Sequence, residues 1–222
     1  MPRVVSKFDL IAFDVDGTLV RGPNGWTVWE LLNDRFTGEP EVNRERYARY
    51  KSGELSYADW VELDVSSWQA AGATREQILE SLEALGLVDG VRETLTALRE
   101  AGSRLIVISG TIDVMLHTLL PDAGFEEIYA NHLAFDEEGR IGHWRATPFD
   151  QRGKAKLLRA VAMREGIPLE RCAFVGDSSN DLWVAQSAGY AIAFNPDCSE
   201  FAEACDVIVR SDDLRDLLPY LT

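Results

Sequence analysis

Short apolar stretches recur along the chain and alternate with segments of helical periodicity. The apolar stretches are 8–15 (FDLIAFDV), 105–109 (LIVIS), 172–176 (CAFVG), 190–194 (YAIAF) and 206–209 (DVIV). The helical patterns fall at 91–101, 114–120, 154–165, 181–187 and 214–218. Apolar runs this short suit strands that are covered on both faces of a parallel sheet. The alternation predicts an α/β fold with a doubly wound (Rossmann-like), mostly parallel sheet.

One long segment breaks this alternation. Between about Trp26 and Leu85 the apolar residues follow helical spacing, and no strand candidate interrupts them. Loop-forming sequences, RGPNG and VDG, bound the segment. We therefore predict a helical cap at residues 22–89, inserted after the first strand, and an α/β core formed by residues 1–21 and 90–222. A hairpin is predicted near 132–144, where EEG supplies a turn.

The chain is strongly acidic. It has 22 Lys and Arg residues against 37 Asp and Glu, a formal net charge of −15. Such a charge repels nucleic acids and anionic lipid surfaces, so neither is expected as a partner. No apolar run reaches the length of a membrane span, and we expect a cytoplasmic protein that is a monomer or a homodimer. The cysteines show no metal-ligand spacing, and we expect free thiols.

Polar residues cluster where three of the predicted strands end. The carboxyl ends of parallel strands meet at one edge of the sheet, and ligands bind there. Carboxylates gathered at such an edge repel each other unless a hard cation lies among them, and Mg²⁺ suits oxygen ligands. The residues expected at this edge are Asp14, Asp16, Ser109, Gly110, Asp177 and Asp181, with Lys154 at the start of a helix.

These groups occur in the order DVDGT, the Ser of ISG, a Lys, and GDSSND, which resembles the haloacid dehalogenase superfamily of phosphatases over nearly the whole chain. The resemblance implies that Asp14 is the nucleophile that forms an aspartyl-phosphate. It implies that Asp16 is the general acid and then the base. It also implies that Mg²⁺ is held by the Asp14 side chain, the Asp16 carbonyl and Asp177, with Asp181 binding directly or through a water.

The same resemblance gives a set of phosphate-binding residues. Lys154 would neutralise both Asp14 and the transferring group, and Lys156 is its rival for this role. Thr18 either touches the phosphate or caps the turn that Gly17 permits. The phosphate-binding set is Gly17, Thr18, Ser109, Gly110, Lys154 and Asn180.

Within the superfamily, the inserted helices and the stretches SGELSYADW, ANHLAFDEEGRIG and CDVIVRSDDLRDLL resemble the phosphoserine phosphatase subfamily. That subfamily holds the amine and carboxylate of its substrate with a cap Glu and a cap Arg. Here these positions fall at or near Pro23, and at Glu62 or Asp64, where acids would repel a carboxylate. We therefore predict that L-phosphoserine is a poor substrate.

Two questions about the cap stay open from sequence. A basic residue from a neighbouring turn would restore carboxylate binding, and the candidates are Arg44, Arg46, Arg49 and Lys51. The candidates for substrate specificity are Tyr57, Glu62 and Asp64. The cap tryptophans are expected mostly in the core, with one or two at the cleft between cap and core.

The expected function is hydrolysis of a small phosphorylated metabolite by a Mg²⁺-dependent phosphomonoesterase. A phosphotransferase or phosphomutase would use the same aspartyl-phosphate and pass it to an alcohol. A phosphate-binding module without catalysis is a third possibility, and it is disfavoured because all of the expected catalytic groups are present.

Overall fold

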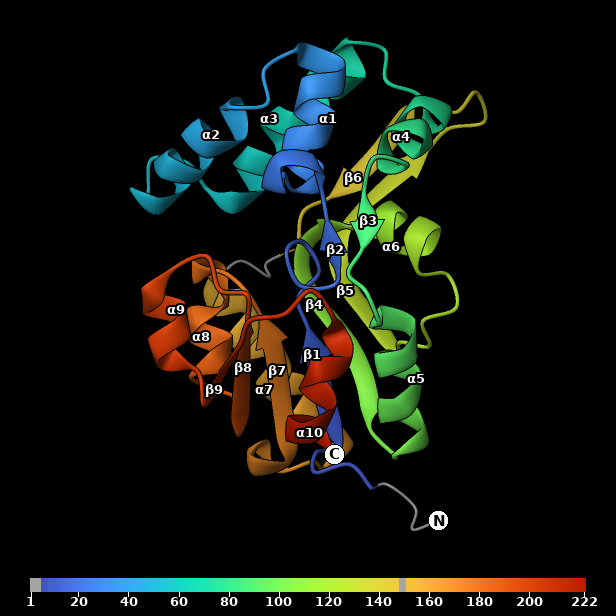
Figure 1. The fold of residues 1–222 in the computed structure, drawn as a ribbon. Coiled ribbons are helices and arrows are strands. Elements are labelled where there is room, and N and C mark those ends of the chain that lie inside the picture. Colours follow the sequence, from blue (N-terminus) through green and yellow to red (C-terminus); the bar gives the residue numbers. More distant parts are fainter. Residues whose placement is uncertain (1–4, 148–150) are drawn as a thin grey trace.

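The computed structural model describes residues 5–147 and 151–222, and its main feature is a seven-stranded sheet in the order β6-β5-β4-β1-β7-β8-β9 (Figure 1). All neighbouring strands are parallel except β5 and β6. The predicted doubly wound α/β fold is confirmed. The strands of this sheet are β1 Leu10–Phe13, β4 Arg104–Ile112, β5 Glu127–Phe135, β6 Ile141–Arg145, β7 Cys172–Gly176, β8 Tyr190–Phe194 and β9 Val207–Val209.

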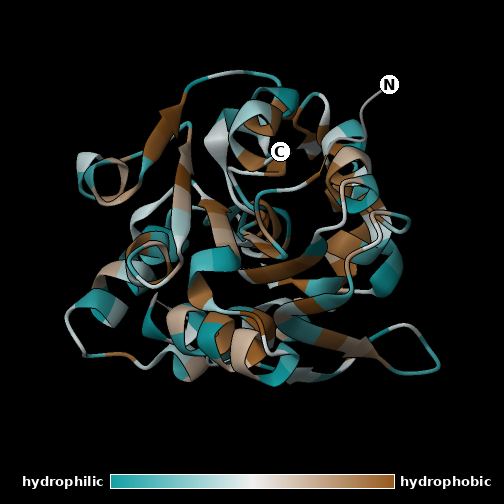
Figure 2. Cartoon of the chain, turned by 90° about the horizontal axis from the view of Figure 1, so that it is seen from below, coloured by the Kyte–Doolittle hydropathy of each residue, from teal (hydrophilic) through white to brown (hydrophobic). Residues whose placement is uncertain are grey.

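Helices cover both faces of the sheet. Because side chains alternate along a strand, Ile11 and Phe13 of β1 belong to one apolar cluster and Leu10 and Ala12 to the other. The first cluster includes residues of α5 (Val91–Glu100), α6 (Asp113–Leu119), η4 (Leu214–Leu217) and α10 (Leu218–Leu221). The second includes residues of α7 (Gln151–Glu165), α8 (Leu182–Ala185) and α9 (Ser199–Ala204). Figure 2 shows the apolar strands between the helices.

Four helices lie between two short strands that follow β1. β2 (Val20–Arg21) and β3 (Gly86–Leu87) pair antiparallel and carry the chain out of the core and back. The helices are α1 Val28–Thr37, α2 Val42–Lys51, α3 Tyr57–Ala70 and α4 Arg75–Leu82, preceded by η1 Pro23–Gly25. They stand above the carboxyl end of β1 (Figure 1). We call this segment the cap.

Side-chain caps start the cap helices where the chain turns. Thr27 and Glu30 form a capping box at the start of α1, and Ser56 accepts a hydrogen bond from the Asp59 N–H at the start of α3. Between these helices, Trp68 and Leu32 are fully buried. The cap therefore has an apolar core of its own that continues into the cluster beneath α5 and α6.

The predicted hairpin is formed by β5 and β6, which pair antiparallel between His132 and Arg145. Its β6 strand contacts the cap, where Gln69 Nε2 donates a 2.8 Å hydrogen bond to the Ile141 carbonyl. Within residues 5–147 and 151–222, none of the helices has the length and apolar character needed to cross a lipid bilayer.

Candidate active site

β1 is the central strand of the sheet. The chain adds β4, β5 and β6 on one side of it and β7, β8 and β9 on the other, so the switch point lies at β1. Asp14 follows β1 directly, and its N–H donates a 2.9 Å hydrogen bond to the Val175 carbonyl of β7. The chain then turns at Gly17, whose φ is +85°. A Cβ at this position would lie 2.1 Å from Asp177 Oδ2, so only glycine allows the turn to approach Asp177 this closely.

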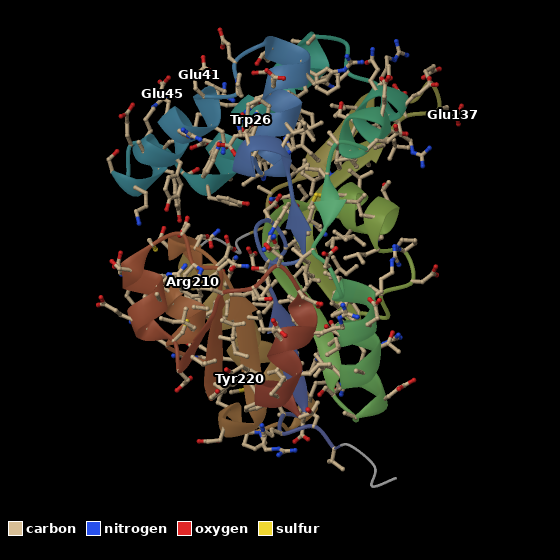
Figure 3. The ribbon with its side chains drawn as sticks, viewed as in Figure 1. Trp26, Glu41, Glu45, Glu137, Arg210 and Tyr220 are labelled. Carbon is tan, nitrogen blue, oxygen red and sulfur yellow. The ribbon has the colours of Figure 1, made fainter. Side chains whose placement is uncertain are left out.

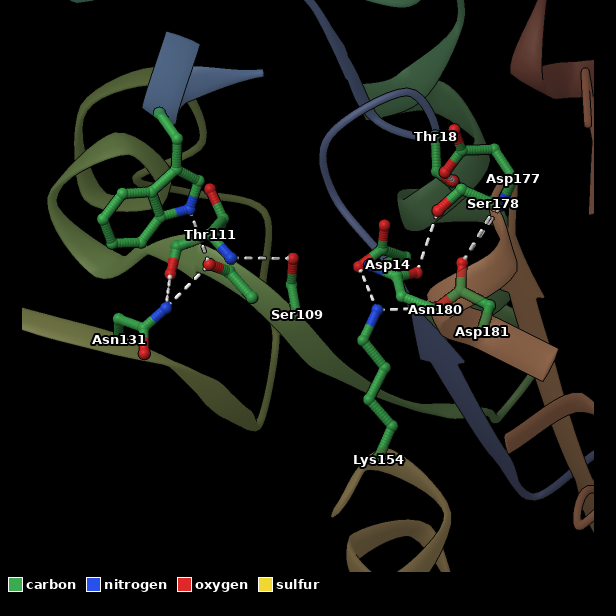
Figure 4. A network of polar contacts seen from close by, with 12 residues as sticks. Asp14, Thr18, Ser109, Thr111, Asn131, Lys154, Asp177, Ser178, Asn180 and Asp181 are labelled. Carbon is green, nitrogen blue, oxygen red and sulfur yellow. Dashed lines mark hydrogen bonds and ion pairs between the residues drawn. The ribbon is translucent and has the colours of Figure 1, made fainter. Parts of the chain in front are cut away.

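A buried lysine joins two of the acids. Lys154 on α7 donates hydrogen bonds of 2.7 Å to Asp14 Oδ1 and 2.6 Å to Asp181 Oδ1 (Figure 4). Burial alone would lower the pKa of Lys154, but the Asp14 and Asp181 carboxylates outweigh this effect and raise it. Lys156, the rival lysine, is exposed on the same helix. Of the two lysines, Lys154 is therefore the one that contacts Asp14.

Asp14, Asp177 and Asp181 form a compact acidic cluster. Each offers one carboxylate oxygen, and these oxygens lie within 4.8 Å of one another. Burial, followed by repulsion from Asp14 and Asp181, raises the pKa of Asp177 well above its ordinary value. Burial also raises the pKa of Asp181 to about 7, although Lys154 opposes the shift. Lys154 supplies too little positive charge for all three, so the cluster fits a divalent cation with oxygen ligands.

Asp16 has a different environment from Asp14. Its Oδ1 accepts a 3.0 Å hydrogen bond from the N–H of Val28, the first residue of cap helix α1. Burial raises the pKa of Asp16 to about 6, and the Val28 hydrogen bond moderates the shift. Its carboxyl is not part of the three-acid cluster, which leaves it available for proton transfer.

Residues near the carboxyl end of β4 form the opposite side of the site. Ser109 is buried, and its Oγ accepts a 3.1 Å hydrogen bond from the Thr111 N–H. The Gly110 carbonyl accepts hydrogen bonds from Trp29 Nε1 at 2.9 Å and Asn131 Nδ2 at 2.7 Å (Figure 4). These contacts fix the backbone that the sequence predicts to bind phosphate. Asn131 had no predicted role in the site, although it lies in the stretch ANHLAFDEEGRIG that resembles the subfamily.

The predicted site residues surround one cavity of about 560 Å³ between cap and core. Asp14, Asp16 and Asp177 lie at its core end, and Asp181 and Lys154 are buried just beneath. Thr18 does not line the cavity, and its hydroxyl donates a 3.2 Å hydrogen bond to Asp177 Oδ1. The remaining predicted phosphate-binding residues on the cavity wall are Gly17, Ser109, Gly110 and Asn180.

The cap side of the cavity differs from the sequence expectations. Three tryptophans line it rather than one or two, together with three tyrosines. Pro23, where the sequence count placed the cap acid, is outside the lining, whereas Glu30 belongs to it. The cap residues that line the cavity are Gly22, Gly25, Trp26, Thr27, Trp29, Glu30, Asn43, Arg44, Tyr47, Tyr50, Tyr57, Trp60, Val61 and Asp64.

The three specificity candidates have separate positions. Tyr57 lines the cavity, and its hydroxyl accepts a 2.8 Å hydrogen bond from Asn131. Asp64 also lines it, but its Oδ1 is paired with Arg46 and with Asn33. Glu62 lies outside the cavity because it faces the hairpin, where it accepts a 2.9 Å hydrogen bond from Trp144 Nε1.

The basic candidates of the cap are mostly engaged elsewhere. Arg46 is bound to Asp64, Arg49 to Glu54, and Lys51 lies 5.8 Å from the centre of the Tyr47 ring. Arg44 is on the cavity wall, 3.4 Å from Glu30, and its side chain is 76% exposed. Of these four basic residues, only Arg44 lines the cavity, and Glu30 lies beside it.

Comparisons with known proteins agree with this geometry. The family model of the haloacid dehalogenase-like hydrolases matches residues 11–186. A phosphoserine phosphatase of Mycobacterium tuberculosis is 34% identical over 197 residues, which are 88% of this chain and 46% of that protein. The phosphoserine phosphatase of Methanocaldococcus jannaschii is 28% identical over 217 residues, covering 97% of this chain and 98% of that one. The chain thus spans about half of the first relative and nearly all of the second.

Two similar solved structures are a substrate-bound phosphoserine phosphatase complex and a phospho-aspartyl intermediate analogue of phosphoserine phosphatase. Each has a TM-score of 0.79 and 25% sequence identity, and the match covers 97% of this chain and 99% of the other. The family model covers well over half of the chain, and its residues include both Asp14 and Asp177. The protein therefore belongs to the haloacid dehalogenase-like hydrolases, and it is similar to phosphoserine phosphatases.

Proposed function

We propose that this protein is a Mg²⁺-dependent hydrolase of a small phosphomonoester and that it works through an aspartyl-phosphate on Asp14. The observation that carries the proposal is the position of Lys154, whose Nζ is bound to both Asp14 and Asp181 beside Asp177. This cluster lies at the end of a 560 Å³ cavity that is large enough for a small metabolite.

In the first step, a carboxylate oxygen of Asp14 attacks phosphorus and the bond from phosphorus to the ester oxygen breaks. Asp16 gives its proton to the departing alkoxide, which leaves as the alcohol. In the second step, Asp16 takes a proton from water, the water oxygen attacks phosphorus, and the acyl phosphate bond breaks to return Asp14. Lys154 stays charged throughout and stabilises the negative charge on Asp14 and on the phosphoryl oxygens.

A cation fits the acidic cluster, because the carboxylates of Asp14, Asp177 and Asp181 face each other with one lysine between two of them, and burial raises the pKa values of Asp177 and Asp181. Asp14 and Asp177 would hold it with side-chain oxygens and Asp16 with its backbone carbonyl. Asp181 would lie behind these ligands and hold them in place, since its Oδ1 is bound to Lys154 and its Oδ2 accepts a 3.2 Å hydrogen bond from the Asp177 N–H. When bound, Mg²⁺ neutralises the phosphoryl group and orients it toward Asp14.

Residues 22–89 would act as a cap over the reacting groups. Hydrogen bonds join cap and core. Three of them connect the Val28 N–H to Asp16, Trp29 Nε1 to the Gly110 carbonyl, and the Tyr47 hydroxyl to Ser179. Such closure excludes water until the alcohol has departed.

The test is a hydrolysis screen of phosphorylated metabolites with Mg²⁺ and with EDTA, with p-nitrophenyl phosphate as a general substrate. We expect release of inorganic phosphate that requires Mg²⁺ and is absent in Asp14→Asn. Added alcohols should not appear as phosphorylated products, which separates hydrolysis from phosphotransfer. Hydrolysis that persists in EDTA or in Asp14→Asn would overturn the proposal.

L-phosphoserine is the second candidate substrate, and the similarity to named phosphoserine phosphatases favours it. The acids of the cap argue against it, because Asp64 and Glu30 line the cavity and would repel the substrate carboxylate. Arg44 is the residue through which phosphoserine would be accepted, if it released Glu30.

A further inference from the structure

Four aromatic rings form a continuous surface on the cap side of the cavity. Tyr47 and Tyr50 come from α2, and Tyr57 and Trp60 come from α3. The ring centres of Trp60 lie 5.9 Å from Tyr47, 6.0 Å from Tyr50 and 6.0 Å from Tyr57. All four residues line the cavity. We call this surface the aromatic wall.

The aromatic wall contacts the core on two sides of the site. The Tyr57 hydroxyl lies 3.4 Å from the Gly110 carbonyl, beside the predicted phosphate-binding backbone. The Tyr47 hydroxyl lies 2.9 Å from Ser179 Oγ, next to Asn180. A short alcohol attached to a phosphoryl group at Asp14 would therefore meet these rings directly.

Unpartnered oxygen atoms accompany the rings. Asp64 is fully buried on the cavity wall, and its Oδ2 has no hydrogen bond of ordinary geometry with a described residue. Trp60 Nε1 on the same wall is a buried donor that also lacks such a bond, and it makes only a weaker polar interaction with the Asp64 carboxylate. Asn43 Oδ1, on the same wall, is buried and without a hydrogen bond as well. Buried acceptors without donors are costly, so a ligand that brings N–H groups would bind favourably here.

The charged residues that line the cavity also favour a cationic ligand. Six acids line the cavity, against two cations, Arg21 and Arg44, among the described residues. Arg21 is bound to Asp212, and Arg44 lies beside Glu30. Aromatic faces attract cations, and the attraction is strongest where water is excluded. A neutral aromatic ring would also stack on the wall, but it would leave Asn43 and Asp64 without donors.

We propose, on the basis of the phosphatase function above, that the substrate is a phosphorylated amino alcohol, with an ammonium group against the aromatic wall and no carboxylate. The cation lies on the rings of Tyr50, Tyr57 and Trp60, and its N–H groups or polarised methyl groups face the oxygens of Asn43 and Asp64. A carboxylate on the same alcohol would lie near Glu30 and Asp64 and be repelled.

The experiment compares kcat/KM of the full chain with Mg²⁺ for a matched set of esters. Phosphoethanolamine and phosphocholine carry the cation, 3,3-dimethylbutyl phosphate is the neutral isostere of phosphocholine, phenethyl phosphate carries a ring, and L-phosphoserine adds the carboxylate. We expect at least one cationic ester to exceed each of the other three by about tenfold or more. An equal or higher value for L-phosphoserine, the neutral isostere or the ring ester would overturn the proposal.

Variants of Trp60 add a second measurement. Trp60→Leu should lower the ratio of kcat/KM for the cationic ester to that for its neutral counterpart by about tenfold, and Trp60→Phe should keep most of it. Trp183→Leu is the matched control, because Trp183 is 39% exposed on α8 and does not line the cavity. An unchanged ratio in folded Trp60→Leu would contradict the proposal. Failure to hydrolyse any ester, p-nitrophenyl phosphate included, would instead overturn the phosphatase function on which the proposal rests.

Discussion

The N–H of Val28 donates a 3.0 Å hydrogen bond to Asp16 Oδ1, which joins the first turn of the cap to the second acid of DVDGT. The N-terminus of a helix carries partial positive charge and lowers the pKa of a nearby carboxyl. Burial has the larger and opposite effect on Asp16, whose pKa is raised to about 6. Cap position and proton transfer are therefore coupled through this contact.

Replacement of Asp16 by Asn should separate its two roles. Asn keeps an oxygen for the Val28 N–H but has no proton to give, so kcat for alkyl phosphates should fall about a hundredfold or more. Nitrophenolate leaves without a proton, so rapid mixing of Asp16→Asn with p-nitrophenyl phosphate should show a burst of nitrophenol followed by slow turnover. Equal loss of the first step for both esters would contradict the role of Asp16 as the acid.

Lys154 and Lys156 offer a matched comparison on one helix. Lys154→Met leaves Asp14 and Asp181 buried without their cation, which should lower the free energy of unfolding by about 3 kcal/mol in metal-free buffer and abolish hydrolysis. Lys156→Met, at an exposed position, should change neither. Urea unfolding and phosphate release measure the two effects. Comparable losses in both variants would remove Lys154 from the site.

Metal binding should depend on pH in a defined direction. Asp177 and Asp181 have raised pKa values, so without metal they favour the protonated form, and their contribution to stability decreases as the pH rises toward 8. Mg²⁺ binds the deprotonated carboxylates, so the increase in unfolding temperature that it causes should be larger at pH 8 than at pH 6. At about 100 times its dissociation constant it should stabilise the fold by about 2.7 kcal/mol. The increase should vanish in Asp177→Asn, and an increase that is independent of pH would argue against these ligands.

Gly17 tests the contact between the turn and Asp177. Gly17→Ala would place a Cβ 2.1 Å from Asp177 Oδ2 at a φ of +85°, so Asp177 must move and both hydrolysis and the Mg²⁺ response should be lost. Gly139→Ala has a similar φ of +77° but open space around it. It should lower stability by about 1 kcal/mol and keep full activity. Calorimetry and phosphate release compare the two variants, and retained activity in Gly17→Ala would contradict the geometry.

The elements that carry chemistry were predictable because they are encoded locally. Buried strands such as Cys172–Gly176 are continuous apolar runs, and the acids follow them directly. The β2–β3 pair was not predicted, because two residues on each side carry no periodic signal. The first half of β5 was also missed, since Glu127–Phe135 mixes polar and apolar residues along a strand that is only partly buried.

The half of the aromatic wall that comes from α2 was not predictable from periodicity. α2 reads as a polar, mixed-charge helix, and none of its residues is buried. Glu41 and Glu45 point outward from it (Figure 3), whereas Tyr47 and Tyr50 face the cavity. A helix face that borders a cavity has no apolar partner to impose a pattern. The pairing of Asp64 with Arg46 depends likewise on the packing of α3 against α2, which no sequence spacing reveals.

The most direct measurement of phosphoryl transfer is mass spectrometry of the enzyme after acid quench during turnover of a phosphate ester with Mg²⁺. Acyl phosphates are most stable at low pH, where pepsin is active, so a peptic peptide that carries Asp14 should keep its phosphoryl group. We predict one added phosphoryl group on this peptide, located on Asp14, and none in Asp14→Asn or in EDTA. An unmodified peptide during active, Mg²⁺-dependent turnover, or a phosphoryl group on another residue, would contradict nucleophilic attack by Asp14.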